Sequence, residues 1–411
     1  MKKASIISIG NELLTGRTDT NTAYLSSELL TIGVPVVSSY TVGDDIEAIV
    51  RSFDLASADA EVILVTGGLG PTDDDLTRQA FAKFLGTELQ LQDELLHHIQ
   101  DFFTERNLEM PEKNKIQAYI PAGARALTNN IGTAPGIMAE VNGKLLFALP
   151  GVPPEMKRMF AESVSPELQR FVGAQAVVVR KLRCFGAGES AIAEKLGSVS
   201  NRGRNPLINY TAGHGIITLH IIAIAKNEEK ACLMVEKDEK FLRDKLGELV
   251  YGTDEQTLAE VVGRELARQE KTIAIAESCT GGTVAKMLTD IPGASEYFRY
   301  GWITYSNSAK TSELNVNPDL IEKYGAVSEQ VAEAMARGAR KKAGADFAIG
   351  ITGIAGPTGG TEQKPVGLVY ISVDSSNFSE TKRCLLYRNR QFTRLRAAQT
   401  ALNMLRLKLN I

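Results

Sequence analysis

Residues 61–75 read EVILVTGGLGPTDDD, a short apolar run that ends in a glycine-rich loop and three aspartates. A compact apolar run bounded by such a loop is typical of a buried strand. Similar runs, separated by segments of helical spacing, lie at residues 6–9, 34–40 and 145–149. This rhythm predicts a parallel sheet with helices on both faces, whose ligands gather at the carboxyl ends of the strands.

The domain organisation follows from the length and from changes in this rhythm. At about 150 residues per domain, 411 residues suggest two to three domains. From about Ala176 the pattern becomes a strand, a helix, a long β-rich run and a charged helix capped by Asn227, and a new amphipathic helix starts at Asp254. We therefore predict an α/β domain at 1–172, a small α+β module at 173–252 and a second α/β domain at 253–411.

The composition excludes several classes of protein. Hydrophobic residues make up 44% and charged residues 23% of the chain, as in soluble globular proteins. A formal net charge of −3 argues against general coating of nucleic acid or of an anionic membrane. No stretch approaches the roughly 18 apolar residues of a membrane helix, and the N-terminus reads as a first strand rather than a signal peptide. We expect a cytoplasmic protein whose four cysteines are free thiols.

The C-terminal domain has to perform any chemistry without histidine, since none of the four histidines follows His220. Residues 276–282, AESCTGG, lie at a predicted strand-to-helix junction, where helix N-terminal amides point at an incoming oxygen. Ser278 or Cys279 is a candidate nucleophile there. A plain turn of small residues is the other interpretation. Without an imidazole, the base is expected to be a lysine whose pKa is lowered by burial or by cationic neighbours.

Lys310 is the lysine best placed for this role. It follows a predicted strand at 298–305 within a polar turn, which puts it at the same end of the sheet as residues 276–282. An ordinary surface lysine is the alternative. Thr352 ends another predicted strand and leads into the glycine-rich residues 353–360, which are interpreted as amide donors, as a lid or as a plain loop.

A basic stretch closes the chain. Residues 382–411 carry eight Lys or Arg and no acid, and Arg390, Arg394 and Arg396 crowd the start of a predicted helix. This setting suits the phosphate of a bound nucleotide. Nucleic acid is the competing interpretation, but the segment lacks the interleaving of aromatic with basic residues that would let bases stack on it.

The N-terminal glycine loop offers a second candidate site. Gly67, Gly68 and Gly70 permit close approach of the backbone to a pyrophosphate, and the aspartates at 73–75 suit a divalent metal. Asp44 follows the second predicted strand and is expected near the same edge. The loop is neither a Walker A loop nor a GxGxxG fingerprint. A helix whose acidic first turn suits its dipole is the alternative.

Together these segments resemble the CinA family, the competence/damage-inducible protein A, over nearly the whole chain. In the N-terminal half the resemblance rests on the TGGLGPTDDD loop and on GNELLTG (10–16), DTN (19–21), GTAPG (132–136) and LPGVPPE (149–155). It implies a MoaB/MogA-like, molybdopterin-binding-like domain associated with metal-dependent ADP-ribose pyrophosphatase activity. The middle module is similar to the family's KH-type insert, without a nucleic-acid clamp.

The C-terminal third resembles the nicotinamide-mononucleotide deamidase of the family. The similarity lies in AESCTGG and in TYSNSAK (304–310), ITGIAGPTGG (351–360) and KPVG (364–367). The family's serine and lysine dyad falls on Ser278 and Lys310, in agreement with the argument from missing histidine. Tyr305, Thr352 and Arg394 fall on supporting positions, with Arg394 expected to hold the 5′-phosphate.

The resemblance therefore implies hydrolysis of nicotinamide mononucleotide to nicotinate mononucleotide and ammonia, without a cofactor. The groups expected to bind this substrate beside the dyad are Cys279, Thr280, Gly281 and Gly353. ADP-ribose is expected at Asn21, Asp44, Gly67, Gly68 and Gly70, with Mg²⁺, Co²⁺ or Mn²⁺ at Asp74 and Asp75. A homodimer is expected, with neither a membrane nor nucleic acid as partner. The alternative function is a non-catalytic nucleotide sensor or DNA-uptake accessory protein.

Overall fold

A computed structural model describes residues 2–173, 176–200, 204–386 and 389–411. These residues form two compact units, one of Met1–Val179 with Ala223–Met234, the other of Arg180–Ile222 with Val235–Ile411. In the part of the chain that the structure describes, no helix is long and apolar enough to cross a membrane.

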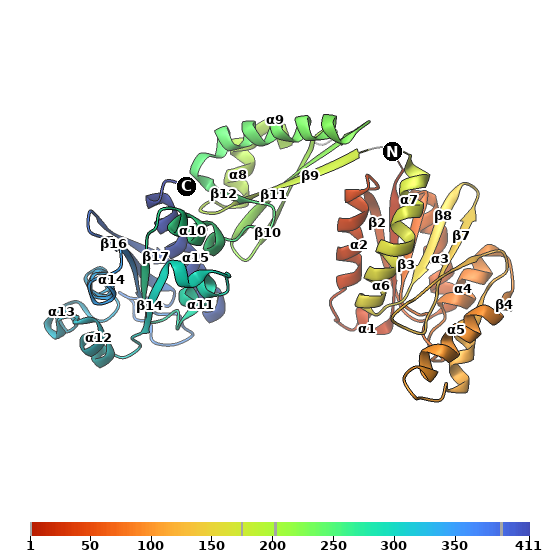
Figure 1. The fold of residues 1–411 in the computed structure, drawn as a ribbon, viewed down its shortest axis with the longest axis horizontal. Helices are drawn as coiled ribbons and strands as arrows, with labels where there is room; N and C mark the ends of the chain where they lie inside the picture. Colours follow the sequence, from red (N-terminus) through yellow and green to blue (C-terminus); the bar gives the residue numbers. More distant parts are fainter. Residues whose placement is uncertain (1, 174–175, 201–203, 387–388) are drawn as a thin grey trace. The chain divides into compact units, whose positions relative to one another are not determined.

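A six-stranded sheet forms the centre of the first unit (Figure 1), in the order β2-β1-β3-β8-β7-β6. The first four strands run parallel, whereas β7 runs antiparallel to both of its neighbours, β8 and β6, so the predicted parallel sheet is mixed at one edge. Asn142 and Gly143, with φ of 51° and 72°, form the two-residue hairpin that reverses the chain between β7 and β8. The strands are β1 (Ala4–Ile9), β2 (Val36–Val42), β3 (Val62–Thr66), β6 (Arg125–Leu127), β7 (Gly136–Val141) and β8 (Lys144–Leu149).

Helices cover both faces of this sheet, as predicted. Successive residues of a strand point to opposite faces, so Ile6 packs in one buried cluster with α2, α6 and α7, and Ile7 packs in another with α3 and α4. The helices are α1 (Asn11–Leu14), α2 (Thr20–Thr31), α3 (Ile46–Asp59), α4 (Thr77–Leu85), α5 (Asp93–Thr104), α6 (Pro153–Met159) and α7 (Ser165–Val172). A small antiparallel pair, β4 (Leu89–Leu91) and β5 (Tyr119–Pro121), lies apart from the main sheet.

The middle segment forms a four-stranded sheet in the order β10-β11-β9-β12. The predicted β-rich run is a hairpin of β10 and β11 that turns at His214 and Gly215. Asn227 accepts a hydrogen bond from the Lys230 amide at 3.1 Å, which confirms the predicted cap. The elements are β9 (Ala176–Cys184), α8 (Glu189–Leu196), β10 (Leu207–Gly213), β11 (Ile216–Ala225), α9 (Glu228–Leu246) and β12 (Val250–Thr253). The module also contains the basic sequence NRGR at 201–204, of which residues 201–203 lie outside the described residues.

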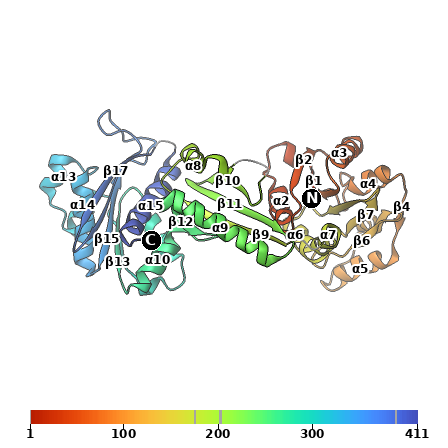
Figure 2. The same ribbon diagram turned by 90° about the horizontal axis from the view of Figure 1, so that it is seen from above.

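The C-terminal sheet has the order β14-β13-β15-β16-β17, in which the first three strands run parallel and β16 runs antiparallel to both of its neighbours. Figure 2 shows α14 on one side of this sheet and α15 on the other. On one face, α10 and α15 bury large apolar residues of the strands. On the other face, α14 packs against the alanines of β13 and β15. The strands are β13 (Ile273–Glu277), β14 (Phe298–Ile303), β15 (Phe347–Gly353), β16 (Leu368–Ser375) and β17 (Ser379–Leu385). The helices are α10 (Leu258–Arg268), α11 (Thr283–Thr289), α12 (Asn307–Leu314), α13 (Pro318–Tyr324), α14 (Glu329–Ala343) and α15 (Arg390–Lys408).

The register of the parallel strands defines one functional edge of this sheet. Glu277, the last residue of β13, pairs with Ile303 of β14 and with Ile351 of β15. The residues that follow these three positions therefore emerge side by side. They include Ser278 and Thr352, which sequence analysis had selected separately.

Candidate functional sites

Ser278 lies in the turn between β13 and α11. Its amide donates to the Ile351 carbonyl at 3.0 Å, and its own carbonyl accepts from the Gly281 amide at 3.1 Å. Gly281 and Gly282 have φ of 58° and 91°, a backbone region in which glycine avoids the steric cost of a side chain. The turn thus holds a largely buried serine at the carboxyl edge of the sheet.

Lys310 reaches this serine from α12. Its Nζ lies 3.2 Å from the Ser278 Oγ, 2.8 Å from the Thr304 carbonyl oxygen and 3.4 Å from that of Tyr305. The lysine is only 1% exposed. Among the described residues, no carboxylate lies within 4.0 Å of its Nζ. Burial lowers the pKa of Lys310, because the charged ammonium loses its hydration without gaining a counter-ion.

Cys279, the other candidate nucleophile, lies next to Ser278. Burial raises the pKa of its thiol to about 12. Only the thiolate is a strong nucleophile, so Cys279 stays in its unreactive form near neutral pH. The geometry therefore favours Ser278.

The expectation that the amides at the start of α11 are free to bind an oxyanion is wrong, because Glu277 occupies them. Its buried carboxylate accepts hydrogen bonds from the amides of Gly282, Val284 and Ala285 at 3.0, 3.2 and 2.9 Å. These are amides of the first turn of α11, the groups that helices leave unpaired. Because the Gly281 amide is also used, the amides of Cys279 and Thr280 are the ones left in this turn without a protein acceptor in the described chain.

A cavity of about 240 Å³ opens beside the dyad. Tyr305, Thr352 and Gly353 line it together with Ser278 and Lys310. The Thr352 hydroxyl donates to the Ala326 carbonyl at 2.7 Å, which joins the end of β15 to the segment before α14. The structure thus brings the predicted Ser278, Cys279, Tyr305, Lys310, Thr352 and Gly353 to one cavity.

Arg394 is placed differently from its expected role at a phosphate. Its guanidinium donates to the Thr280 carbonyl from Nε at 3.0 Å and from Nη2 at 2.8 Å, and it does not line the cavity. It therefore braces the turn that carries Ser278. Arg390, one turn earlier on α15, lines the cavity and donates to the Gly356 carbonyl at 2.9 Å and to the Tyr305 hydroxyl at 3.3 Å.

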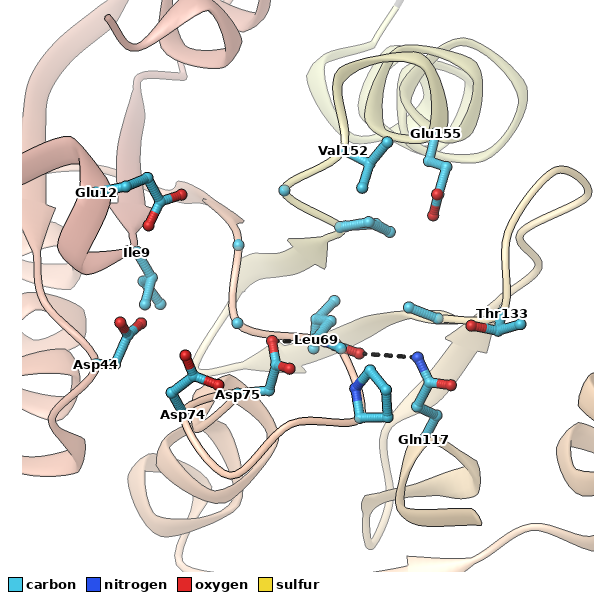
Figure 3. Close-up of a pocket in the computed structure, with 18 of the residues that line it drawn as sticks. Ile9, Glu12, Asp44, Leu69, Asp74, Asp75, Gln117, Thr133, Val152 and Glu155 are labelled. Carbon is cyan, nitrogen blue, oxygen red and sulfur yellow. Dashed lines mark hydrogen bonds between the residues drawn. The ribbon is translucent and has the colours of Figure 1, made fainter. Parts of the chain in front are cut away.

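The glycine loop of the first unit lines a second cavity, of about 510 Å³ (Figure 3). Gly67 and Gly68 both have positive φ, and a Cβ on either would lie within 2.2 Å of a neighbouring oxygen, on Ile9 or on Thr77. The loop consequently requires glycine at both positions. Gly70 also lines the cavity, where carboxylates gather from Glu12, Asp44, Asp74 and Asp75.

These carboxylates are not equivalent. Asp75 accepts hydrogen bonds from the amides of Gly70 and Thr72, both at 2.8 Å, and from the Thr72 hydroxyl, so it holds the loop together. Burial raises the pKa of Asp44, and the negative charges of Asp74 and Glu12 raise it further. Among the described residues, no three His, Cys, Asp or Glu side chains are grouped to hold a metal ion. Carboxylate oxygens are ligands that a divalent cation prefers. Asp44 and Asp74 fit this role, whereas Asp75 does not, because its carboxylate already accepts hydrogen bonds from the loop.

Two further residues support the glycine loop. Asn21 donates to the Thr66 hydroxyl and to the Gly151 carbonyl, both at 2.9 Å, and it lines a smaller adjoining cavity. Arg78, which sequence analysis missed, is 1% exposed and donates to the carbonyls of Leu69 and Gly70 at 2.6 Å. In the sequence, Arg78 is recognisable only as an arginine at the start of the helix that follows an acidic loop. Because an arginine in a helix is commonly exposed, its position alone does not predict burial.

Comparison with known proteins matches three family descriptions to successive parts of the chain. The chain matches the family description "CinA C-terminal domain" over residues 255–409, "Probable molybdopterin binding domain" over 5–170 and "Damage-inducible protein CinA KH domain" over 179–252. A "CinA-like protein" of Kosmotoga olearia is 44% identical over 405 residues, which cover 98% of each chain.

Solved structures match part of the chain. The competence/damage inducible protein CihA of Agrobacterium tumefaciens is 39% identical, with a TM-score of 0.37 over 38% of this chain and 94% of that one. The competence damage-inducible protein A (ComA) of Klebsiella pneumoniae is 33% identical, with a TM-score of 0.37 over 37% of this chain and 95% of that one.

Proposed function

Because the chain belongs to the CinA family, we propose that its C-terminal domain hydrolyses nicotinamide mononucleotide to nicotinate mononucleotide and ammonia. The observation that carries the proposal is the contact between the Lys310 Nζ and the Ser278 Oγ, at 3.2 Å in a buried site where no described carboxylate pairs with the lysine. Burial without an opposite charge favours the neutral amine of a lysine. Such an amine can act as a general base toward a neighbouring hydroxyl.

The hydrogen bonds of Lys310 orient its lone pair. A neutral amine has two N–H donors and one lone pair. The carbonyl oxygens of Thr304 and Tyr305 accept the two N–H bonds, which leaves the lone pair directed at the Ser278 hydroxyl. Lys310 therefore accepts the hydroxyl proton as the Ser278 Oγ attacks the carboxamide carbon.

The remaining steps conserve atoms and protons. The tetrahedral intermediate collapses by breaking the bond from carbon to nitrogen, and Lys310 returns its proton to the departing ammonia. A water molecule then attacks the Ser278 ester, Lys310 takes the proton from water, and the proton passes to the Ser278 Oγ as nicotinate leaves. Amides of Cys279 and Thr280 are the proposed donors to the oxyanion.

Binding of the phosphate is assigned to Arg390 rather than to Arg394. The cavity of about 240 Å³ is smaller than the roughly 300 Å³ at which ligand pockets usually begin, so it suits the pyridine ring and carboxamide. Arg390 is exposed and lines this cavity. From there it reaches a 5′-phosphate that extends outward.

Release of ammonia from nicotinamide mononucleotide by the purified chain tests the proposal. We expect release by the parent protein, without added metal, and its loss in Ser278→Ala. A non-catalytic nucleotide sensor, the alternative function, would bind the same compound in calorimetry and release no ammonia. Equal rates in the parent and in Ser278→Ala would reject the mechanism.

We propose a second activity, metal-dependent cleavage of the ADP-ribose pyrophosphate, for the cavity of the first unit. The observation that favours it is a glycine loop facing mutually repelling carboxylates, of which Asp44 has a raised pKa. Asp44 and Asp74 would hold Mg²⁺, Co²⁺ or Mn²⁺, and such an ion supplies charge neutralisation of the pyrophosphate. The loop backbone around Gly67, Gly68 and Gly70 would lie against the phosphates, while Asn21 and Asp75 keep the loop in shape.

Appearance of AMP from ADP-ribose, with and without each metal, tests this second activity. Asp44→Asn and Asp74→Asn are expected to weaken the metal dependence. Cleavage that is equally fast after exhaustive chelation, or equally fast in both variants, would contradict it.

A further inference from the structure

A third cavity, of about 550 Å³, lies in the second unit, away from Ser278. Its walls come from β17, from α15 between Arg396 and Lys408 and from the residues that follow β9, with Phe185 among them. Neither proposed activity uses it. Its volume falls within the range of about 300–1,000 Å³ that small-molecule sites occupy, so it has room for a metabolite.

The charged groups of this cavity are mostly basic. Lys382, Arg383, Arg396 and Lys408 line it, against two acids, Glu248 and Glu380. One of these acids is already used, because Glu380 pairs with Lys408 at 2.6 Å. Within the described residues, Lys382, Arg383 and Arg396 form no ion pair with a carboxylate. The cavity therefore carries a net charge of +2 and three cations without a partner acid.

Arg396 is held in a fixed orientation at this cavity. Its guanidinium carbon lies 4.0 Å from the ring centroid of Phe185, and its Nη1 donates to the Gly215 carbonyl. A Cβ on Gly215, whose φ is +81°, would come within 2.7 Å of that nitrogen. Burial lowers the pKa of Arg396, because the charged guanidinium loses hydration and no carboxylate among the described residues pairs with it.

A half-buried guanidinium without a carboxylate is costly unless something else neutralises it. Its planar fork of donors matches phosphate oxygens, and the exposed Lys382 and Arg383 add mobile charge at the same wall. Among the described residues that line the cavity, Phe185 is the one aromatic ring, and it is 4% exposed and already covered by Arg396. This described lining offers a base no free ring to stack on.

We infer that this cavity binds a phosphate-bearing small molecule, recognised through its phosphate groups by Arg396, Lys382 and Arg383. The ligand is an inorganic polyphosphate or a sugar phosphate, which share this chemistry. The inference does not depend on either proposed activity, because it uses none of the residues assigned to them.

Hydrogen exchange of the full chain tests the inference, with inorganic pyrophosphate and ribose 5-phosphate as separate probes. We expect at least one probe to slow exchange of residues 379–386 in a saturable manner. Slowing by pyrophosphate alone identifies an inorganic anion, and slowing by ribose 5-phosphate identifies a sugar phosphate. The local readout separates this cavity from the glycine loop, which also binds pyrophosphate under the proposed second activity.

Two variants and a control complete the experiment. Lys382→Gln, an exposed position, is expected to raise the dissociation constant about tenfold, as loss of a charge-assisted hydrogen bond does, and Arg396→Gln at least as much. Lys341→Gln, an exposed lysine of α14 outside the cavity, keeps the parent value. If neither probe slows exchange, or if Lys382→Gln and a folded Arg396→Gln both bind like the parent, the inference is wrong.

Discussion

The Nζ atom of Lys310 lies 3.2 Å from the Oγ atom of Ser278, although the two residues are 32 positions apart and sit on different elements. Both are largely buried. Because the lysine has carbonyl oxygens and a hydroxyl as its partners, with no acid among them, its proton is held weakly. This contact connects the chemistry of the cavity with the pH dependence of the protein.

Replacing Lys310 by methionine should abolish most of the amidohydrolase activity. Loss of a general base typically costs about 10²–10⁴ in rate, so kcat should fall by that factor. The fold should survive, since a buried charge is exchanged for an apolar chain of similar length. Lys286→Met, a matched change at an exposed lysine of α11, should keep full activity in the same ammonia assay. A decrease of less than about threefold in Lys310→Met would contradict the role as base.

The rate should rise with pH as Lys310 loses its proton. Its folded pKa is lowered from the usual value, so the rise is centred below the pH at which an exposed lysine titrates, about 10.4. Stability should also rise with pH between the lowered folded pKa and the ordinary unfolded pKa, because the unfolded chain binds more protons there. Denaturant unfolding at several pH values across this interval gives the free energy of unfolding as a function of pH. This free energy should rise less steeply with pH for Lys310→Met than for the parent. Equal slopes would mean that the pKa of Lys310 is not lowered in the folded protein.

Cys279 should resist alkylation and be dispensable as a nucleophile. With a thiol pKa of about 12, very little thiolate exists at pH 8. Mass spectrometry after iodoacetamide treatment should find Cys279 unmodified in the folded protein, and Cys232, which is partly exposed, modified. Cys279→Ala should keep kcat within a few-fold of the parent. Loss of ammonia release in a folded Cys279→Ala variant would instead support the thiol as nucleophile.

Arg390 and Arg394 should have separable effects. Arg390→Ala should raise KM for nicotinamide mononucleotide about tenfold or more with a small change in kcat, since Arg390 lines the cavity. Arg394→Ala removes two hydrogen bonds to the Thr280 carbonyl and should lower kcat and the melting temperature together. Steady-state kinetics and thermal unfolding of both variants distinguish a residue that binds the substrate from one that supports the turn carrying Ser278. The reverse pattern would restore Arg394 as the phosphate ligand.

Arg78 should prove essential to the shape of the glycine loop. Its guanidinium donates to the carbonyls of Leu69 and Gly70 from a position that is 1% exposed, and the Leu69 carbonyl also accepts from Gln117 at 3.4 Å. Removing the guanidinium takes the donor from the Gly70 carbonyl, and a buried carbonyl without a donor costs about 1–3 kcal/mol. Arg78→Met should therefore destabilise the first unit and weaken ADP-ribose binding, and Arg78→Lys should rescue little, since one ammonium cannot reproduce the fork. Denaturant unfolding and calorimetry with ADP-ribose check both points. A fully stable Arg78→Met would contradict this role.

Local sequence patterns determined much of the fold. Alternation of buried strands with amphipathic helices predicted both α/β sheets, and Asn227 predicted a cap that the structure contains. The antiparallel edge strands were harder to foresee, because apolar spacing indicates a strand without indicating its direction. The Asn142–Gly143 turn was the local signal for the reversal between β7 and β8.

For the candidate residues, too, some features could be predicted from the sequence and others required the tertiary structure. Missing histidine in the C-terminal domain pointed to a lysine base, and the junction at 276–282 pointed to Ser278 or Cys279, all from residue type and position. Only the tertiary structure favours the serine over the thiol in the proposed mechanism, because burial, which raises the pKa of Cys279, depends on what packs around it. It also reassigned the helix amides to Glu277 and exchanged Arg394 for Arg390 at the cavity, since a side chain four residues along a helix meets different neighbours. Residue types and local spacing are carried by the chain itself, whereas desolvation and hydrogen-bond partners come from distant segments that meet only on folding.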